Sequence, residues 1–113
     1  MPDDCIFCKI VNNEIPSPRV YENDYVIAID DINPVAKVHA LIITKKHMLD
    51  LLELDIEDAG LLRGVHEAVR SVAKIKGVAE TGFRLISNCG SDGRQAVPHL
   101  HFHIIGGQRL SGR

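Results

Sequence analysis

The sequence predicts an α+β fold in which a five-stranded antiparallel meander sheet packs against one main α-helix. Three observations lead to this class. Short apolar runs recur between turn signals, which is typical of strands. One longer segment repeats its apolar residues at helical spacing. The run from His99 to Ile105 alternates histidine with apolar residues, as a strand with two different faces does.

The predicted strands are bounded by connection and turn residues. A connection rich in Asn, Pro and Ser covers residues 12–18, Asn23 marks a short turn, and Asn33-Pro34 marks another. The segment 25–29 is almost entirely apolar, as expected of a central strand. The five strands are predicted over residues 19–22, 24–30, 39–44, 82–88 and 99–105.

The main helix is predicted from Asp55 to about Lys76. Asp55 is a suitable N-cap, and Gly77 is a suitable stop. His66 lies beside the apolar stripe, so we expect a solvated histidine without a catalytic role. The stripe consists of Ile56, Ala59, Leu62, Val65, Val69, Val72 and Ala73.

Length and composition indicate one soluble domain over residues 1–113. Apolar residues make up 45% and charged residues 25% of the chain, and the net charge of -2 indicates no nucleic-acid or membrane partner. Apolar runs such as residues 40–43 are too short to cross a bilayer. Residues 1–4 lack the basic and apolar regions of a signal peptide, so we expect a cytoplasmic protein.

The histidines at 99, 101 and 103 share one strand face in this prediction, with Leu100, Phe102 and Ile104 turned toward a core. Alternate strand residues are about 6.6 Å apart, which separates the outer two histidines by roughly 13 Å. Because ligand nitrogens lie about 2 Å from zinc, one ion cannot take all three. Imidazole also attacks and transfers protons near neutral pH, which indicates catalysis unless the row is merely a polar strand face.

The loop before the histidine strand suits an anion. Gly90 and Gly93 let backbone amides turn inward, and Asn88 and Gln95 add neutral donors beside the histidines. A glycine-rich turn alone is weak evidence, but this one adjoins three histidines on one face. We therefore expect phosphate binding here.

Cys5-x-x-Cys8 can supply half of a tetrahedral zinc site. Three cysteines in an apparently cytosolic chain argue against a disulfide framework. His47 and His99 are the best candidates for the other half because each lies at the end of a predicted strand. A redox pair and a pair of reduced thiols remain the alternatives.

Five motifs occur in a fixed order along the chain: Cys5-Ile6-Phe7-Cys8-Lys9-Ile10, Glu14-Ile15-Pro16, Asp31-Ile32-x-Pro34, His39-x-Leu41-x-Ile43-x-Lys45-x-His47 and Asn88-x-Gly90-x-x-Gly93-x-Gln95-x-Val97-x-His99-x-His101-x-His103-Ile104-Ile105-Gly106-Gly107. Together they resemble the histidine triad (HIT) family, in its Hint branch of purine nucleoside phosphoramidases. The resemblance covers essentially the whole chain. It implies the HIT-like fold, which adds a short second helix to the predicted architecture.

The resemblance implies a homodimeric hydrolase that acts on purine nucleoside 5'-phosphoramidates and releases AMP or GMP. His101 would attack the α-phosphorus and become transiently nucleotidylated, while His103 would touch a phosphate oxygen. The backbone around His99 would hold the other ring nitrogen of His101, and His39 would assist proton movement. Asn88 and Gln95 match catalytic positions near the phosphate and leaving group.

Nucleotide binding is assigned by the same resemblance. Asp31 matches the carboxylate that accepts the ribose hydroxyls. The apolar slot for the purine is matched by Ile6, Phe7, Ile10, Ile29 and Ile32, and the remaining nucleotide-binding positions are Asn88, Gln95, Ala96, Val97, His101 and His103. For the isoleucines alone, core packing would be the default interpretation.

The set of Cys5, Cys8, His47 and His99 also resembles a structural zinc site found in part of the bacterial branch. No cofactor is implied for the chemical step. Ala96 departs from the family because many relatives carry a serine there, and Thr44 stands where a proline is usual. The chain also ends soon after the histidine strand, without a tryptophan.

Three other functions compete with this interpretation. A dinucleoside polyphosphate hydrolase of the same family is the nearest enzymatic alternative. A nucleotide-binding scaffold with little turnover is the second, because Ala96 and the short tail weaken the catalytic case. Metal-dependent hydrolysis by the histidine row is the third, and the spacing of the row argues against it.

Overall fold

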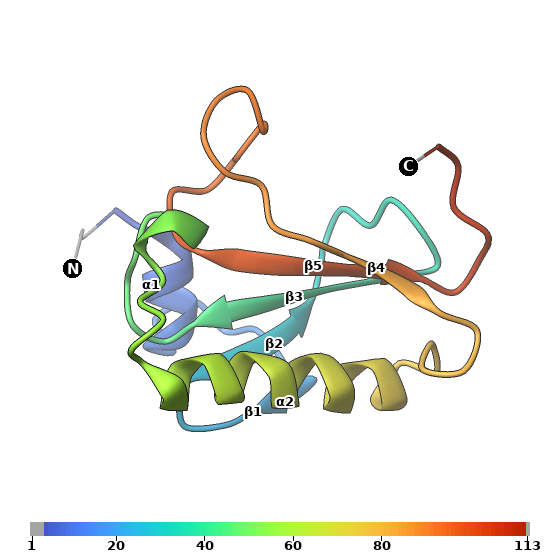
Figure 1. The fold of residues 1–113 in the computed structure, drawn as a ribbon, viewed down its shortest axis with the longest axis horizontal. Helices are drawn as coiled ribbons and strands as arrows, with labels where there is room; N and C mark the ends of the chain where they lie inside the picture. Colours follow the sequence, from blue (N-terminus) through green and yellow to red (C-terminus); the bar gives the residue numbers. More distant parts are fainter. Residues whose placement is uncertain (1–3, 113) are drawn as a thin grey trace.

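The computed structural model describes residues 4–112, so the expectation drawn from the first residues of the chain lies partly outside the described part. The elements follow in the order shown in Figure 1. They are α1 (Ile6–Val11), β1 (Tyr21–Glu22), β2 (Val26–Asp30), β3 (Val38–Thr44), the 3₁₀ turn η1 (Leu51–Glu53), α2 (Ala59–Ile75), β4 (Phe83–Ile86) and β5 (His101–Gly106). None of the helices within residues 4–112 has the length and apolar character needed to span a membrane.

The five strands form one antiparallel sheet, as predicted, with the order β1-β2-β3-β5-β4. The predicted meander holds only as far as β3, because β5 inserts between β3 and β4. Burial explains the order. β5 is buried along almost its whole length and suits the middle of the sheet, whereas β4 alternates exposed and half-buried residues and suits an edge.

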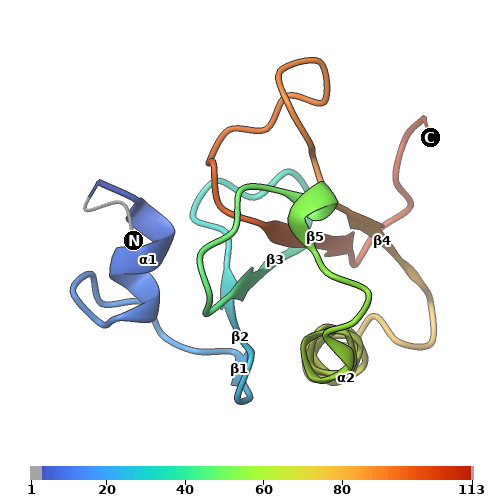
Figure 2. The same cartoon turned by 60° about the vertical axis from the view of Figure 1, so that its left-hand side comes forward.

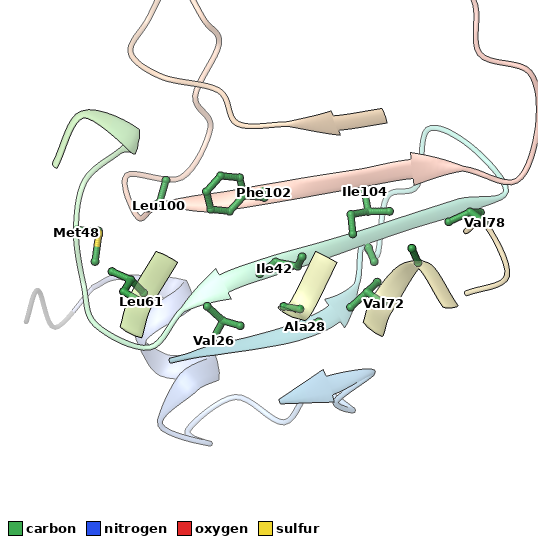
Figure 3. Close-up of a cluster of buried hydrophobic side chains, with 13 residues drawn as sticks. Val26, Ala28, Ile42, Met48, Leu61, Val72, Val78, Leu100, Phe102 and Ile104 are labelled. Carbon is green, nitrogen blue, oxygen red and sulfur yellow. The ribbon is translucent and has the colours of Figure 1, made fainter. Parts of the chain in front are cut away.

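The two helices lie on opposite faces of the sheet (Figure 2). The face covered by α2 holds the main core (Figure 3). The face covered by α1 holds a second, smaller core. The main core includes Val26, Ala28, Ala40, Ile42, Leu61, Ala68, Val72, Leu100, Phe102 and Ile104, and the second includes Phe7, Ile10, Ile27, Ile29, Leu41 and Ile43.

The start of α2 corrects the predicted cap. Asp58, not Asp55, is the N-cap, and its side chain accepts a hydrogen bond from Leu61 N at 2.9 Å. Asp55 instead accepts from Glu57 N in the preceding turn, which leaves Ile56 outside the helix and 81% exposed. Both aspartates satisfy the cap preference, so the sequence pattern does not separate them.

The end of α2 agrees with the prediction. Gly77 has a φ of 74°, the left-handed conformation that glycine adopts after a helix C-terminus. His66 is exposed on the helix, as expected of a solvated histidine. The predicted stop and the predicted surface residue therefore both hold.

The ladder of β5 begins at His101, two residues later than predicted. His99 and Leu100 precede the paired strand, although the alternation of faces continues through them. Leu100, Phe102 and Ile104 all enter the main core, as the sequence predicted. His99 is thus buried but lies outside the strand ladder.

Candidate active site and metal cluster

Three histidines share the α1 face of the sheet at the centre of the molecule. In the β3–β5 ladder, His101 is opposite Ile43 and His103 is opposite Leu41. His39 on β3 lies diagonally from His103, because it is opposite Ile105. Residues opposite each other in an antiparallel pair point to the same face, so the register places all three imidazoles together.

His101 is held in one tautomer. Its Nδ1 lies 2.7 Å from the backbone oxygen of His99. A carbonyl oxygen only accepts hydrogen bonds, so Nδ1 carries the proton and the Nε2 of the neutral ring is bare. Burial lowers the pKa of His101, against the opposing effects of the His99 carbonyl and the Asp31 charge. The ring is therefore a neutral imidazole with a lone pair on Nε2 at pH 7, as the family resemblance implied.

His39 and His103 are joined ring to ring. Val35 N donates to Nδ1 of His39 at 3.1 Å, so neutral His39 carries its proton on Nε2. That Nε2 lies 2.9 Å from Nδ1 of His103 and 3.3 Å from a carboxylate oxygen of Asp31. Nδ1 of His103 therefore accepts, which places its own proton on Nε2.

Burial, followed by the neighbouring charges of His101 and His39, lowers the pKa of His103 to about 4. His103 is thus neutral at pH 7. The site presents one imidazole nitrogen with a lone pair, on His101, and one imidazole N–H, on His103. The first can act as a nucleophile, and the second can donate a hydrogen bond.

The ligand atoms of Asp31, His39 and His103 lie within 4.8 Å of one another, which is close enough for a metal ion. The Val35 amide argues against that use. Because it occupies Nδ1 of His39, the lone pair that a metal would need on Nε2 is replaced by a proton. This group is better suited to moving protons than to binding a cation.

The loop between β4 and β5 is braced from within. Gln95 donates from Nε2 to the backbone oxygens of Leu49 (2.7 Å) and Val97 (3.1 Å), and its Oε1 accepts from Gly90 N (3.0 Å). Asn88 donates to Gly93 O at 2.8 Å. Both amide side chains, predicted as donors for an anion, therefore make hydrogen bonds within or beside the loop.

Gly93 is required where it stands. A Cβ at this position would lie 2.4 Å from the backbone oxygen of Cys89. Gly90 has a φ of 73°, which favours glycine for a different reason. Lack of space for a Cβ thus requires glycine at position 93, and a positive φ favours it at position 90.

The predicted purine-slot residues divide into two groups. Phe7, Ile10 and Ile29 are buried in the second core, and the ring of Phe7 meets that of His101 edge-on at 4.9 Å between centroids. Ile6 and Ile32 are 48% and 91% exposed. Among the predicted slot residues, which all lie in the described chain, only Ile6 and Ile32 therefore have enough exposed apolar surface to contact a ligand.

A cavity of about 270 Å³ opens beside Ile6. It brings Ile6 of α1 together with Ala96 and Val97 of the long loop. Asp31 lies at the end of β2, half-buried, with its other carboxylate oxygen accepting from Asn33 N at 2.8 Å. The complete lining of the cavity is Asp4, Cys5, Ile6, His47, Ala96, Val97 and Pro98.

Cys5, Cys8, His47 and His99 form a second group, here called the Cys/His cluster. Nδ1 of His99 lies 3.3 Å from Sγ of Cys5, 3.5 Å from Sγ of Cys8 and 3.2 Å from Nδ1 of His47. Sγ of Cys8 is 3.2 Å from Nδ1 of His47. All four ligand atoms lie within 4.8 Å of one another, so the cluster can hold a metal ion.

Local contacts prepare the cluster. Nε2 of His99 donates to Thr44 O at 2.7 Å, so Nδ1 of neutral His99 is bare and faces the other three ligands. Cys5 caps α1 by accepting from Cys8 N at 3.4 Å. Burial and the adjacent Cys5 thiol raise the pKa of Cys8 to about 11. The sequence prediction of these four ligands together agrees with their placement.

Two contributors had no signal in the sequence. The Val35 amide sets the tautomer of His39, and a backbone amide has no residue-type signature. The backbone oxygen of Thr44 sets the tautomer of His99, whereas the sequence marked Thr44 only as a departure from proline. Both act through backbone atoms, which sequence motifs do not display.

Comparisons with known proteins all match the chain to proteins of the HIT family. Residues 12–110 match the model of the HIT domain. A HIT family hydrolase from Clostridium thermocellum is 45% identical, with a TM-score of 0.93 over 100% of this chain and 98% of that one. A histidine triad protein from Clostridium difficile is 48% identical, with a TM-score of 0.92 over 100% and 98% of the two chains.

Among sequence relatives, Protein HitA of Neisseria gonorrhoeae is 42% identical over 92% of this chain and 96% of its own. An uncharacterised HIT-like protein of Azospirillum brasilense is also 42% identical, over 93% and 87% of the two chains. The fold, the register of the histidines and these matches agree. The chain belongs to the HIT family.

Proposed function

We propose that this protein hydrolyses purine nucleoside 5'-phosphoramidates through a nucleotidyl intermediate on His101. One observation supports this most directly. The hydrogen bond from Nδ1 of His101 to the His99 oxygen, at 2.7 Å, leaves Nε2 as a neutral nucleophile in a buried site.

In the first step, Nε2 of His101 forms a bond to the α-phosphorus as the bond from phosphorus to the amine breaks. The N–H of His103 donates a hydrogen bond to a phosphate oxygen, and the amine takes up a proton from solvent as it leaves. In the second step, water attacks phosphorus and gives up a proton to solvent. The bond to His101 then breaks, and the nucleoside monophosphate is released.

His39 and Asp31 support His103 and His101 in this scheme. Nε2–H of His39 lies 2.9 Å from His103 and 3.3 Å from Asp31, so it donates to Nδ1 of His103 and keeps the proton of that ring on Nε2. The Asp31 carboxylate would balance the positive charge that forms on His101 when its Nε2 is bonded to phosphorus. Phosphoryl transfer depends mainly on positioning and charge stabilisation. The loop between β4 and β5 is suited to positioning a phosphate because the hydrogen bonds of Asn88 and Gln95 hold it in one conformation.

The nucleoside would lie along the surface formed by Ile6 and Ile32, with the ribose near Asp31. The exposed apolar area of the two isoleucines and the half-buried carboxylate support that orientation. Ala96 offers no hydroxyl to the phosphate, so the site has one hydrogen-bond donor fewer than relatives with serine there.

Zinc is the metal we propose for the Cys/His cluster. Bonds of about 2.3 Å to sulfur and about 2.0–2.1 Å to nitrogen place tetrahedral ligand atoms roughly 3.3–3.8 Å apart. The contacts between ligand atoms are 3.2–3.5 Å, and two thiols with two imidazoles form a donor set that zinc prefers. A closed four-ligand site supplies structural stability and leaves the chemical step to the histidines.

A homodimer is also proposed. β4 is an edge strand, and Phe83 and Leu85 on it are 37% and 45% exposed. Leu85 is opposite Ile104, a main-core residue, so these side chains lie on the same face of the sheet as α2. An exposed apolar strip along an edge strand is a suitable interface for a second copy.

The decisive experiment traps the intermediate. The protein is incubated with a slowly hydrolysed AMP-amidate, and the intact mass is measured during turnover. An adduct with the mass of a nucleotidyl group is expected in the wild type and in the control His66→Ala, and is absent from His101→Ala. Normal turnover by His101→Ala would contradict the mechanism.

The same assay separates the competing functions. Faster cleavage of a diadenosine polyphosphate than of the AMP-amidate would favour the polyphosphate hydrolase. AMP binding without turnover of either compound by the wild type would favour the scaffold. Cytoplasmic location is proposed from the sequence and is tested by cell fractionation.

A further inference from the structure

His99 belongs to two structures at once. Its ring contributes Nδ1 to the Cys/His cluster, and its backbone oxygen accepts the Nδ1 proton of His101 at 2.7 Å. We propose that His99 is a positioning residue through which the metal-bound state of the Cys/His cluster sets the orientation of the nucleophile. This inference rests on the proposed function, which gives His101 its role.

Several contacts fix the position of the His99 oxygen. The paired part of β5 starts at His101, so the ladder does not hold the backbone of His99. Loop contacts hold it instead: His99 N donates to Val97 O at 2.8 Å, and Leu100 N donates to Met48 O at 2.7 Å. The side chain of His99 adds a further anchor to the carbonyl that orients His101.

That side chain is fixed at both ring nitrogens. Nε2 bonds to the backbone oxygen of Thr44, and Nδ1 faces the cluster. The ring is fully buried, with an exposed fraction of 0%. A metal bond at Nδ1 would tie this ring to α1 through Cys5 and Cys8, and to the end of β3 through His47.

The second connection runs through α1. Cys5 and Cys8 flank Phe7, whose ring meets His101 at 4.9 Å and His99 at 5.9 Å between centroids. A metal held by both cysteines would therefore fix the aromatic wall of the nucleophile along with its hydrogen-bond acceptor. The hydrogen bond and the ring contact described here therefore both connect His101 to the cluster. His99 is one of the four ligands, and Phe7 lies between Cys5 and Cys8 in the sequence.

The consequence is a reaction whose rate depends on a metal that does not touch the substrate. Misplacing a reacting group by about 1 Å lowers rates by on the order of a hundredfold. We expect a loss of this size in the rate of His101 nucleotidylation when the metal is removed, with restoration on adding zinc back.

The test compares zinc-loaded and chelator-stripped wild type, at a temperature where circular dichroism shows both folded. Histidine ring nitrogens are observed by nitrogen-15 NMR without substrate, and nucleotidylation is measured by mass in parallel. The proposal expects the Nδ1 signal of His101 to change on stripping and to return with zinc. Cys8→Ser should reproduce the stripped spectrum, and Lys9→Ala, on the same helix, should retain the zinc-loaded one.

An unchanged His101 signal in the stripped protein overturns the proposal, as does an unchanged nucleotidylation rate. If the stripped protein unfolds, cadmium replaces zinc, because it keeps the four ligands while lengthening the metal bonds. A shifted His101 Nδ1 signal in the cadmium protein then supports the proposal, and an unshifted one overturns it. A metal-dependent signal without any nucleotidyl adduct in either form would instead contradict the proposed function.

Discussion

Nε2 of His39 lies 2.9 Å from Nδ1 of His103, and this one contact decides which nitrogen of His103 carries the proton. Nε2 of His39 is the donor because its Nδ1 accepts a hydrogen bond from Val35 N. A backbone amide in the β2–β3 connection thereby determines the tautomers of two rings.

His39→Ala should slow the chemical step more than it weakens binding. Without the Nε2–H of His39, either ring nitrogen of His103 can carry the proton, and its hydrogen bond to the phosphate becomes weaker. A hydrogen bond to a charged group contributes about 1.5–3 kcal/mol, so we expect kcat to fall by about 10- to 100-fold while KM changes little. Steady-state kinetics check this, with His66→Ala as the control. Equal kcat in His39→Ala and the wild type would contradict this role of His39.

Activity should persist on the acidic side of the ordinary histidine pKa. Burial lowers the pKa of both His101 and His103, the latter to about 4. The nucleophile His101 is therefore still mostly neutral at pH 6.5, and it is protonated only at lower pH. We expect kcat to be maintained as the pH falls through 6.5 and to decline only below that pH, which a pH profile of kcat measures.

The same lowered pKa values affect stability in a defined direction. Between the folded pKa and about 6.5, the unfolded chain binds more protons than the folded chain, so stability falls as the pH decreases through this window. Titration of the His103 ring signals by NMR checks both statements. A His103 pKa near 6.5 would contradict them.

Removing the metal should lower the thermal stability. Ligand that binds only the folded chain stabilises it by about 4 kcal/mol at a thousandfold excess over Kd. For a domain of this size that corresponds to roughly 10–20 °C in Tm. Calorimetry of the zinc-loaded protein with and without chelator measures the shift. Cys89→Ser is the control, because Cys89 lies in the long loop outside the cluster and should leave the shift unchanged.

Ala96→Ser should increase the rate of the enzyme. Ala96 is exposed on the loop beside the cavity, so an added hydroxyl has room to donate to the phosphate or the leaving group. A net hydrogen bond of about 1 kcal/mol corresponds to roughly a fivefold gain. Turnover of an AMP-amidate measures it, with Ala96→Val as a variant that adds bulk without a hydroxyl. A gain in both variants would show that the hydroxyl is not the cause.

Leu85→Glu should separate the proposed dimer. A charge in the middle of the exposed strip of β4 opposes burial against a second copy, while the edge position lets the monomer fold. Analytical ultracentrifugation measures the change in mass. Lys74→Glu, exposed near the end of α2, tests whether added negative charge alone has the same effect.

The fold was largely predictable because its periodicities are strong. Alternation through residues 100–104 identified the core face of β5. The predicted stripe of the helix was only partly right, because Val72 and Ala73 are buried but Ala59 and Leu62 are exposed. The residues buried in the first half of α2 are Leu61, Gly64 and Ala68. The position of β5 beside β3 was not predictable in the same way, since strand order depends on which strand can be buried on both faces. The cap at Asp58 was missed because Asp55 offers the same chemistry three residues earlier.

The site shows the same division. The Cys/His cluster could be assembled from spacing and residue type, because metal ligands are few and distinctive. The protonation pattern of the histidines could not, because it depends on the oxygens of Thr44 and His99 and on the amide of Val35. The internal bonds of Gln95 likewise depend on how the loop closes against Leu49.

Alternate side chains of strand β3 point to opposite faces of the sheet and contact different groups of residues. Ala40 and Ile42 enter the main core, while His39, Leu41 and Ile43 face the second core and the histidines. Inserting or deleting one residue inside this strand would exchange the two sets, turning His39 toward α2 and core side chains toward the catalytic face. Length changes in this lineage are therefore expected in the flanking loops, where evolution can alter the chain without inverting the strand.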